Sequence, residues 1–268
     1  MKNDLQKNAD RFLGFANTYD NVRPSCPKYV LKCLINYLGY KPQTVVDFGC
    51  GTGLSTKFWS KYSNNVIGIE PSKDMINLAI KKSKNYKNIK YINAFSNETG
   101  LNDNIADIIT CSQSFHWMEP ISTLKEVNRL LKPNGIFAVY DCDWPPVFKW
   151  EIDFEYEKLF NKVFEIEATH KEFKNSFSRW NKNEHLNNLK NSGHFRFVRE
   201  IVFTNTEKCT ADRYIGIALS QGGLQSIIKN NIELIKPELD SFIEKVKMAF
   251  DNKTYNIDFC YRMRIGVK

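Results

Sequence analysis

The sequence lacks the features that mark several protein classes. No apolar run approaches the roughly 20 residues that a membrane-spanning helix needs. The charged start of the chain also lacks the apolar stretch of a secretory signal. None of the seven cysteines forms a Cys-x-x-Cys pair, so a metal site is not indicated. Because Cys111 and Cys142 lie in strand-like runs, we expect buried, reduced thiols and a cytoplasmic protein.

The charge of the chain is high but is not concentrated in one place. A net charge of +8 is compatible with nucleic-acid binding. The lysines, however, are spread along helix-like stretches, and later in the chain they alternate with acids. Lysine and asparagine are abundant throughout, which is typical of a compositional bias. We therefore expect no nucleic acid or membrane as a partner, and a monomer or a homodimer.

A glycine-rich turn is the most informative feature that is present. Residues 44–56 read TVVDFGCGTGLST, which predicts a buried strand, a turn and the start of a helix. Gly49, Gly51 and Gly53 permit positive φ and let a ligand approach the backbone closely. The helix that follows presents free N–H groups at the same place. These features predict a nucleotide-like ligand, and taken alone they fit NAD or FAD as well.

Asp47 distinguishes between these ligands, because it precedes the first glycine by two residues. A carboxylate at the end of a buried strand would repel a pyrophosphate and attract an ammonium group. A dinucleotide fingerprint also requires its third glycine three residues after the second, whereas Gly53 follows Gly51 by two. S-adenosylmethionine carries an ammonium, a sulfonium and no phosphate. Charge and spacing therefore both favour this ligand.

Glu70 ends the next expected strand, residues 65–70. A carboxylate at the tip of this strand can accept hydrogen bonds from both hydroxyls of a ribose. Nicotinamide enzymes use an acid here too, so Glu70 indicates a ribose rather than one cofactor. A solvated acid at a strand end is the alternative interpretation.

Asp47-x-Gly49-x-Gly51-x-Gly53 followed by Glu70 resembles the first two motifs of class I S-adenosylmethionine-dependent methyltransferases. The small-molecule branch of that family, methyltransferase type 11, includes trans-aconitate-type methyltransferases. Three further segments resemble that branch: Tyr19-Asp20-x-x-Arg23-Pro24, SQSFHW at 112–117 and LLKPNG at 130–135. The resemblance covers roughly residues 12–145 well and the last hundred residues loosely.

The resemblance implies an α/β fold. It would be a Rossmann-like, seven-stranded, mostly parallel sheet with helices on both faces and an antiparallel last strand. A helical insertion would cover the substrate. We expect a single methyltransferase domain that includes a helical lid at 1–42 and a cofactor-binding core at 43–143. The insertion would occupy 144–192, and residues 193–268 would complete the sheet.

The resemblance also implies the cofactor S-adenosyl-L-methionine, with S-adenosyl-L-homocysteine as product. The residues expected to bind it are Tyr19, Arg23, Asp47, Gly49, Cys50, Gly51, Gly53, Glu70, Pro71, Phe95, Ser96, Gln113 and Ser114. Tyr19 and Arg23 would touch the methionine end, although both would also fit a solvated lid face. Phe95 and Ser96 would meet the adenine, in a loop where relatives carry an acid that binds the adenine amino group; residues 94–98, AFSNE, depart from that pattern.

His116 is the candidate catalytic base because it follows the expected strand at 106–111, at the edge where ligands bind. A histidine that packs on Trp117 and shapes the pocket floor is the alternative. His116, Trp117 and Trp144 are the expected substrate-binding residues. An aromatic stripe at 148–189 is typical of a core, but some of its rings are expected to line the acceptor pocket. His185 is expected at the surface or in the insertion.

These features predict a methyltransferase acting on a small molecule, and O-methylation of a carboxylic acid is the favoured reaction. A carboxylate, with a reference pKa of about 4, is already ionised at neutral pH and needs no base. The net charge leaves an RNA or protein methyltransferase as one alternative. The unusual adenine loop leaves a non-catalytic S-adenosylmethionine-binding homologue as another.

Overall fold

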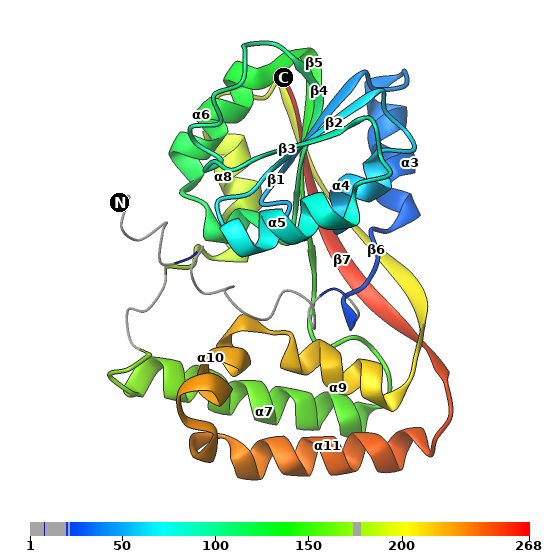
Figure 1. Ribbon diagram of the computed structural model, residues 1–268, viewed down its shortest axis with the longest axis vertical. Coiled ribbons are helices and arrows are strands. Elements are labelled where there is room, and N and C mark those ends of the chain that lie inside the picture. Colours follow the sequence, from blue (N-terminus) through cyan, green and yellow to red (C-terminus); the bar gives the residue numbers. More distant parts are fainter. Residues whose placement is uncertain (1–7, 9–19, 21, 174–177) are drawn as a thin grey trace.

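The computed structural model describes residues 8, 20, 22–173 and 178–268. These residues form one seven-stranded sheet with helices on both faces, and a layer of helices beyond one end of the sheet (Figure 1). The strand order is β3-β2-β1-β4-β5-β7-β6. The predicted lid residues 1–7, 9–19 and 21, including Tyr19, lie outside the described residues.

The sheet is parallel except for its last strand in the chain. Its strands are β1 Thr44–Phe48, β2 Asn65–Ile69, β3 Ile89–Ile92, β4 Ala106–Ser112, β5 Leu131–Cys142, β6 Phe197–Cys209 and β7 Tyr255–Val267. Strands β1 to β5 pair in parallel, and β7 runs antiparallel to both β5 and β6. The predicted fold class is therefore confirmed.

Aromatic and apolar residues that alternate with polar ones at 194–204 predict a sixth strand in this part of the chain. The observed β6 runs further, from Phe197 to Cys209, and pairs with β7 along its whole length. It is an edge strand, and among its residues only Cys209 is buried. Its alternation of polar and apolar residues is therefore too weak to show where the strand ends.

Two helical layers cover the sheet. The helices on its faces are α3 Lys28–Leu38, α4 Leu54–Trp59, α5 Lys73–Lys82, α6 Pro120–Leu130 and α8 His185–Asn191. Successive residues of β1 point to opposite faces: Val45 joins the core beneath α3 and α4, and Val46 joins the core beneath α6 and α8. Because both faces are covered, the β-branched residues of β1 are buried.

A cap of four further helices lies beyond the carboxyl ends of the parallel strands (Figure 1). They are α7 Trp150–Thr169, α9 Ala211–Leu219, α10 Gly222–Asn231 and α11 Lys236–Phe250. The described residues also form three short 3₁₀ helices: η1 Phe115–Trp117, η2 Lys182–Glu184 and η3 Ile232–Leu234. The cap has its own core, in which Tyr156, Tyr214, Phe242 and Phe250 pack together. The cap thus draws on two separate stretches of the chain, and the predicted insertion supplies only α7.

No helix in the described part of the chain is long and apolar enough to cross a bilayer.

Candidate active site

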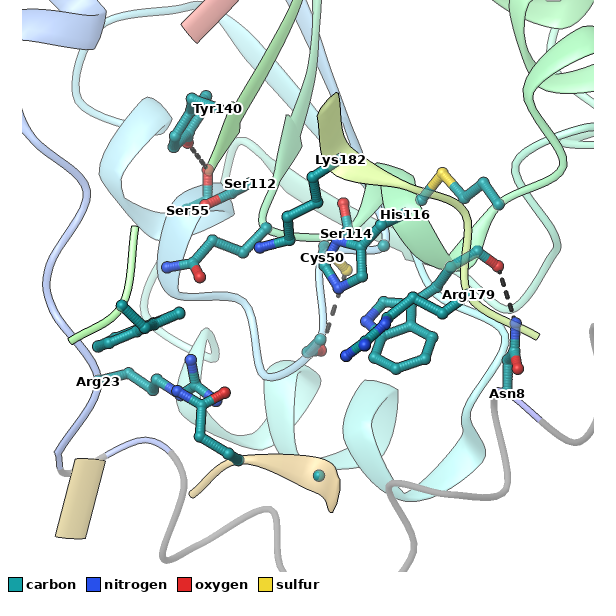
Figure 2. A pocket seen from close by; sticks show the side chains of 18 of the residues that line it. Asn8, Arg23, Cys50, Ser55, Ser112, Ser114, His116, Tyr140, Arg179 and Lys182 are labelled. Carbon is teal, nitrogen blue, oxygen red and sulfur yellow. Dashed lines mark hydrogen bonds between the residues drawn. The ribbon is translucent and has the colours of Figure 1, made fainter. Parts of the chain in front are cut away.

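A cavity of about 530 Å³ lies between the carboxyl ends of the strands and the cap. Its volume falls in the range of about 300–1,000 Å³ that is typical of small-molecule sites. The glycine turn after β1, the end of β2 and the segment after β4 line its sheet side. Helices α7 and the start of α10 line its cap side. Figure 2 shows side chains from both sides converging on this space.

The three glycines of the turn have different structural roles. All have positive φ: 61° at Gly49, 54° at Gly51 and 81° at Gly53. A Cβ on Gly51 would meet no atom within 4 Å, whereas one on Gly49 would lie 2.6 Å from the Cβ of Ser114. Gly53 caps α4 and does not line the cavity, because Tyr91 and Ala79 pack against it. The turn is therefore open to a ligand at Gly51, and Gly53 serves packing rather than the cofactor contact expected of it.

Asp47 lies buried at the end of β1, on the cavity wall. Its Oδ2 accepts a hydrogen bond from Thr56 Oγ1 at 2.7 Å, and its Oδ1 accepts one from Thr110 Oγ1 at 3.0 Å. Burial raises the pKa of Asp47 to about 6, and the two threonine hydroxyls oppose that shift. The carboxylate is thus held in place, and its remaining lone pairs are available to a cationic ligand.

Glu70 is buried directly after β2 and ties the turn to the next helix. Its Oε2 accepts a hydrogen bond from the Gly51 N–H at 2.9 Å, and its Oε1 accepts one from the Ser72 N–H at 2.9 Å. Burial raises the pKa of Glu70 to about 7, and both N–H groups oppose that shift. Each oxygen keeps one lone pair, so the carboxylate can still accept hydrogen bonds from two ribose hydroxyls. The residues present therefore fit the adenosine part of S-adenosylmethionine.

Most other predicted cofactor residues also line the cavity. They are Arg23, Gly49, Cys50, Pro71, Phe95, Ser96, Gln113 and Ser114. Arg23 donates from Nη2 to the Ser220 carbonyl at 2.9 Å, and its guanidinium lies 5.4 Å from the centre of the Trp144 ring. Arg23 therefore joins the strand side of the cavity to the cap.

The predicted substrate residues His116, Trp117 and Trp144 line the same cavity as the cofactor candidates. His116 is buried, with its Nδ1 3.6 Å from Asp141 Oδ1 and its ring 4.7 Å from that of Trp117. Burial, followed by the positive charge of Lys182, lowers the pKa of His116 to about 4. The imidazole is therefore neutral at pH 7 and a weak base.

Sequence reasoning missed a charged cluster around Asp141, at the end of β5. Lys182 Nζ lies 3.1 Å from Asp141 Oδ1, Arg264 Nη1 lies 3.5 Å from Oδ2, and His185 Nε2 lies 3.8 Å from Oδ2. Although burial raises the pKa of Asp141, Lys182 and His116 hold it well below its ordinary range. His185 was expected at the surface or in the insertion; it lies within the expected insertion, at the start of α8, and is fully buried rather than at the surface. An acid at the carboxyl end of a strand was the available signal for Asp141; nothing local marks Lys182.

Two polar residues near the N-terminus contact this region. Asn8 lines the cavity and donates from Nδ2 to the Trp117 carbonyl at 3.1 Å and to the Ser178 carbonyl at 2.7 Å. Asp20 accepts hydrogen bonds from Thr52 Oγ1 in the glycine turn and from Lys82 Nζ at the end of α5. Asn8 and Asp20 are thus bonded to separate segments next to the cavity. Within the described residues, no group of three or more His, Cys, Asp or Glu side chains could hold a metal ion.

Comparison with known proteins places the glycine turn in a family. Residues 46–139 match the family model described as a methyltransferase domain. Over 126 residues the chain is 30% identical to the Saccharomyces cerevisiae protein named "Probable S-adenosylmethionine-dependent methyltransferase CRG1". That alignment covers 46% of this chain and 43% of the relative. An uncharacterized methyltransferase-like protein of Schizosaccharomyces pombe is 22% identical over 247 residues, which cover 91% of this chain and 89% of the relative.

The fold is also found among solved structures. A protein of Anaeromyxobacter dehalogenans with the provisional name of type II methyltransferase superimposes with a TM-score of 0.68 at 16% identity. The superposition covers 91% of this chain and 97% of that one. The chain spans about half the length of the first curated relatives it matches, between 43% and 55%.

The strand order is that of a Rossmann-like α/β protein. The cavity at the carboxyl edge of the sheet, next to the glycine turn, is its candidate ligand site. The matched segment, residues 46–139, is similar to a methyltransferase domain, and the Saccharomyces cerevisiae relative is named as a probable S-adenosylmethionine-dependent methyltransferase. This similarity implies S-adenosylmethionine as the cofactor to be tested.

Proposed function

We propose that this chain transfers a methyl group from S-adenosylmethionine to a small molecule, and that the reaction is O-methylation of a carboxylic acid. One observation carries the proposal: a single cavity joins the glycine turn to an acceptor space beneath the cap. Asp47 and Glu70 line this cavity next to the glycine turn, and His116, Trp117 and Trp144 line it as well. A site covered by helices suits a metabolite better than a nucleic acid or a protein chain.

Each part of the cofactor would contact different residues of the cavity. Glu70 would accept the ribose hydroxyls, and Asp47 would face the ammonium group. Phe95 would lie against the adenine ring and Ser96 would reach one of its nitrogens, while Arg23 would pair with the α-carboxylate. When bound, the cofactor supplies a methyl group on a positively charged sulfur, which is an activated leaving group. The protein then has to align the acceptor and exclude water, which contributes about 7–11 kcal/mol in well-oriented reactions.

The weak basicity of His116 favours an acceptor that is already ionised. A carboxylate oxygen would supply the electron pair for the new bond to the methyl carbon, and the cofactor, when bound, would supply that methyl group on a sulfonium whose sulfur keeps the electron pair of the broken bond. No proton moves in this step, so a histidine whose pKa is about 4 is no handicap. His116 would then act as a wall of the acceptor space, together with Trp117 and Trp144. An alcohol or a protonated amine would need a stronger base than this imidazole.

Two other functions remain testable alternatives. The net charge of +8 supports an RNA or protein methyltransferase, which should shift labelled RNA or methylate a polypeptide. The adenine loop at residues 94–98 departs from the family pattern, which supports a non-catalytic homologue that binds S-adenosylmethionine; turnover of any acceptor would exclude it. The seven free cysteines fit a reducing compartment, so we also propose a cytoplasmic location.

The test is a calorimetric titration of S-adenosylmethionine into the wild type, Asp47→Asn and Asp240→Asn. The wild type and Asp240→Asn, which changes an exposed acid on α11, should bind alike. Asp47→Asn should bind about tenfold or more weakly, because it removes the charge that faces the ammonium group. Melting curves check that each variant is folded, and NAD serves as the competing ligand. No binding of S-adenosylmethionine by the wild type, or preferential binding of NAD, would contradict the proposal.

A further inference from the structure

Lys182 lines the cavity, and the proposed function assigns it no role. It begins η2, and the segment before it is attached to η1 by the Trp180 N–H, which donates to the His116 carbonyl at 2.9 Å. Its side chain is 34% exposed and lines the cavity. Figure 2 shows it beside His116, on the side of the cavity opposite Arg23.

Asp141 is a buried carboxylate next to the ammonium group of Lys182. Its side chain is 2% exposed, and neither of its oxygens has a well-formed hydrogen bond. Buried atoms around it are also unsatisfied: His116 Nδ1, both ring nitrogens of His185 and Arg264 Nη1. Arg264 already donates from Nε to Glu200 Oε2 at 2.8 Å, so it is shared between two acids. Lys182 is therefore the cation that balances Asp141 at the cavity wall.

The other cations of the cavity are less suited to hold an acceptor next to His116. Arg23 is bonded to the Ser220 carbonyl, and Arg179 lies 5.7 Å from the centre of the Phe164 ring, exposed at the rim. The acids Glu157 and Glu167 line the cavity from α7, on the cap side, together with the rings of Tyr156 and Phe160. They would repel an anion from the cap and direct it toward Lys182, with an apolar body against the rings.

We propose that Lys182 binds the carboxylate of the methyl acceptor, and that Asp141 is a positioning residue that holds the Lys182 side chain in place between turnovers. The inference rests on the proposed function and specifies its substrate class as an acid with an apolar body. Methylation turns the carboxylate into a neutral ester. The product therefore loses its attraction to Lys182, which returns to Asp141.

The experiment measures acceptor binding without turnover. Protein saturated with S-adenosylhomocysteine is titrated by calorimetry with benzoate, phenylacetate, hexanoate and indole-3-acetate, and with the corresponding neutral amides. At least one acid should bind, and its amide should bind about tenfold or more weakly. Lys182→Met should weaken acid binding by about the same factor, and Lys182→Arg should restore most of it. Lys190→Met, which changes an exposed lysine on α8, is the matched control.

Asp141 needs a readout that general destabilisation would not alter. In Asp141→Asn, Lys182 loses the carboxylate that lies 3.1 Å from its Nζ. Acid binding by this variant should therefore weaken while its binding of S-adenosylhomocysteine stays at the wild-type level, and Asp141→Glu should restore part of the acid binding. An Asp141→Asn variant that binds the acids like the wild type would refute the positioning role.

The remaining outcomes separate the inference from the proposed function. If S-adenosylhomocysteine does not bind, both fail. If it binds but no acid of the panel does, or if Lys182→Met binds acids like the wild type, the role of Lys182 is refuted. Methyl transfer to an amine or an alcohol would then leave the protein a methyltransferase with a different acceptor.

Discussion

At the scale of single residues, the glycine turn shows how one sequence pattern contains different physical requirements. Gly49 is needed because Ser114 packs where its side chain would be, and Gly53 because Tyr91 and Ala79 do. Gly51 has open space, and its N–H donates to Glu70. The requirement for glycine at Gly51 is therefore the left-handed backbone together with the approach of a ligand.

Replacing Gly51 should separate these two requirements. Gly51→Ala and Gly100→Ala both place a methyl group at positive φ in open space, 54° and 71° respectively. Each should lose about 1–2 kcal/mol of stability. Only Gly51→Ala should also weaken S-adenosylmethionine binding, by about tenfold, because its methyl group enters the cavity. Urea unfolding and calorimetry measure the two effects, and equal affinities of the two variants would show that no ligand approaches Gly51.

At the scale of elements, α7 shows what helical spacing determines. The aromatic stripe predicted a helix that serves mainly as core, and Tyr156 and Leu159 are indeed buried in the cap. Phe164 and Phe160 line the cavity, and Phe154 faces solvent. Spacing shows which residues share a face of the helix, but the neighbours of each face come from α9 to α11, far along the chain.

Two substitutions in α7 test this assignment of faces. Leu159→Ala removes a fully buried side chain from the cap core and should lower the free energy of unfolding by about 2–5 kcal/mol. Phe154→Ala removes a side chain that is 59% exposed and should change it by about 0.5 kcal/mol or less. Unfolding by urea, monitored by tryptophan fluorescence, gives the free energy of unfolding of each variant. Similar losses in both variants would mean that the face bearing Phe154 is covered in solution.

At the scale of the whole molecule, sheet and cap together enclose the acids that the ligand would meet. Burial raises the pKa of Glu70 to about 7 and that of Asp47 to about 6, whereas both would titrate near 4 in water. A ligand that carries a positive charge and donates hydrogen bonds from its hydroxyl groups stabilises the ionised carboxylates. The pKa values of Asp47 and Glu70 should therefore be lower in the complex than in the free protein.

S-adenosylmethionine binding should consequently release protons and weaken as the pH falls. Between pH about 8 and pH about 7 the affinity should change little, and below pH about 7 it should decline as Glu70 and then Asp47 become protonated. Calorimetry in buffers of different ionisation enthalpy measures the protons released, and Glu70→Gln should remove the part of this release that occurs near pH 7. An affinity that stays constant down to pH about 5.5 would show that these carboxyl groups do not face the ligand.

The amino-acid sequence by itself determined the features whose causes lie close together along the chain. These are the strand, turn and helix around residues 44–56 and the acid that directly follows β2. Only the tertiary structure decided the acceptor half of the site. Asp141, Lys182 and His185 come from separate elements that the fold brings together. The low pKa of His116 arises because this residue is buried among them. Burial is produced by contacts between distant segments, so spacing within one segment does not reveal it.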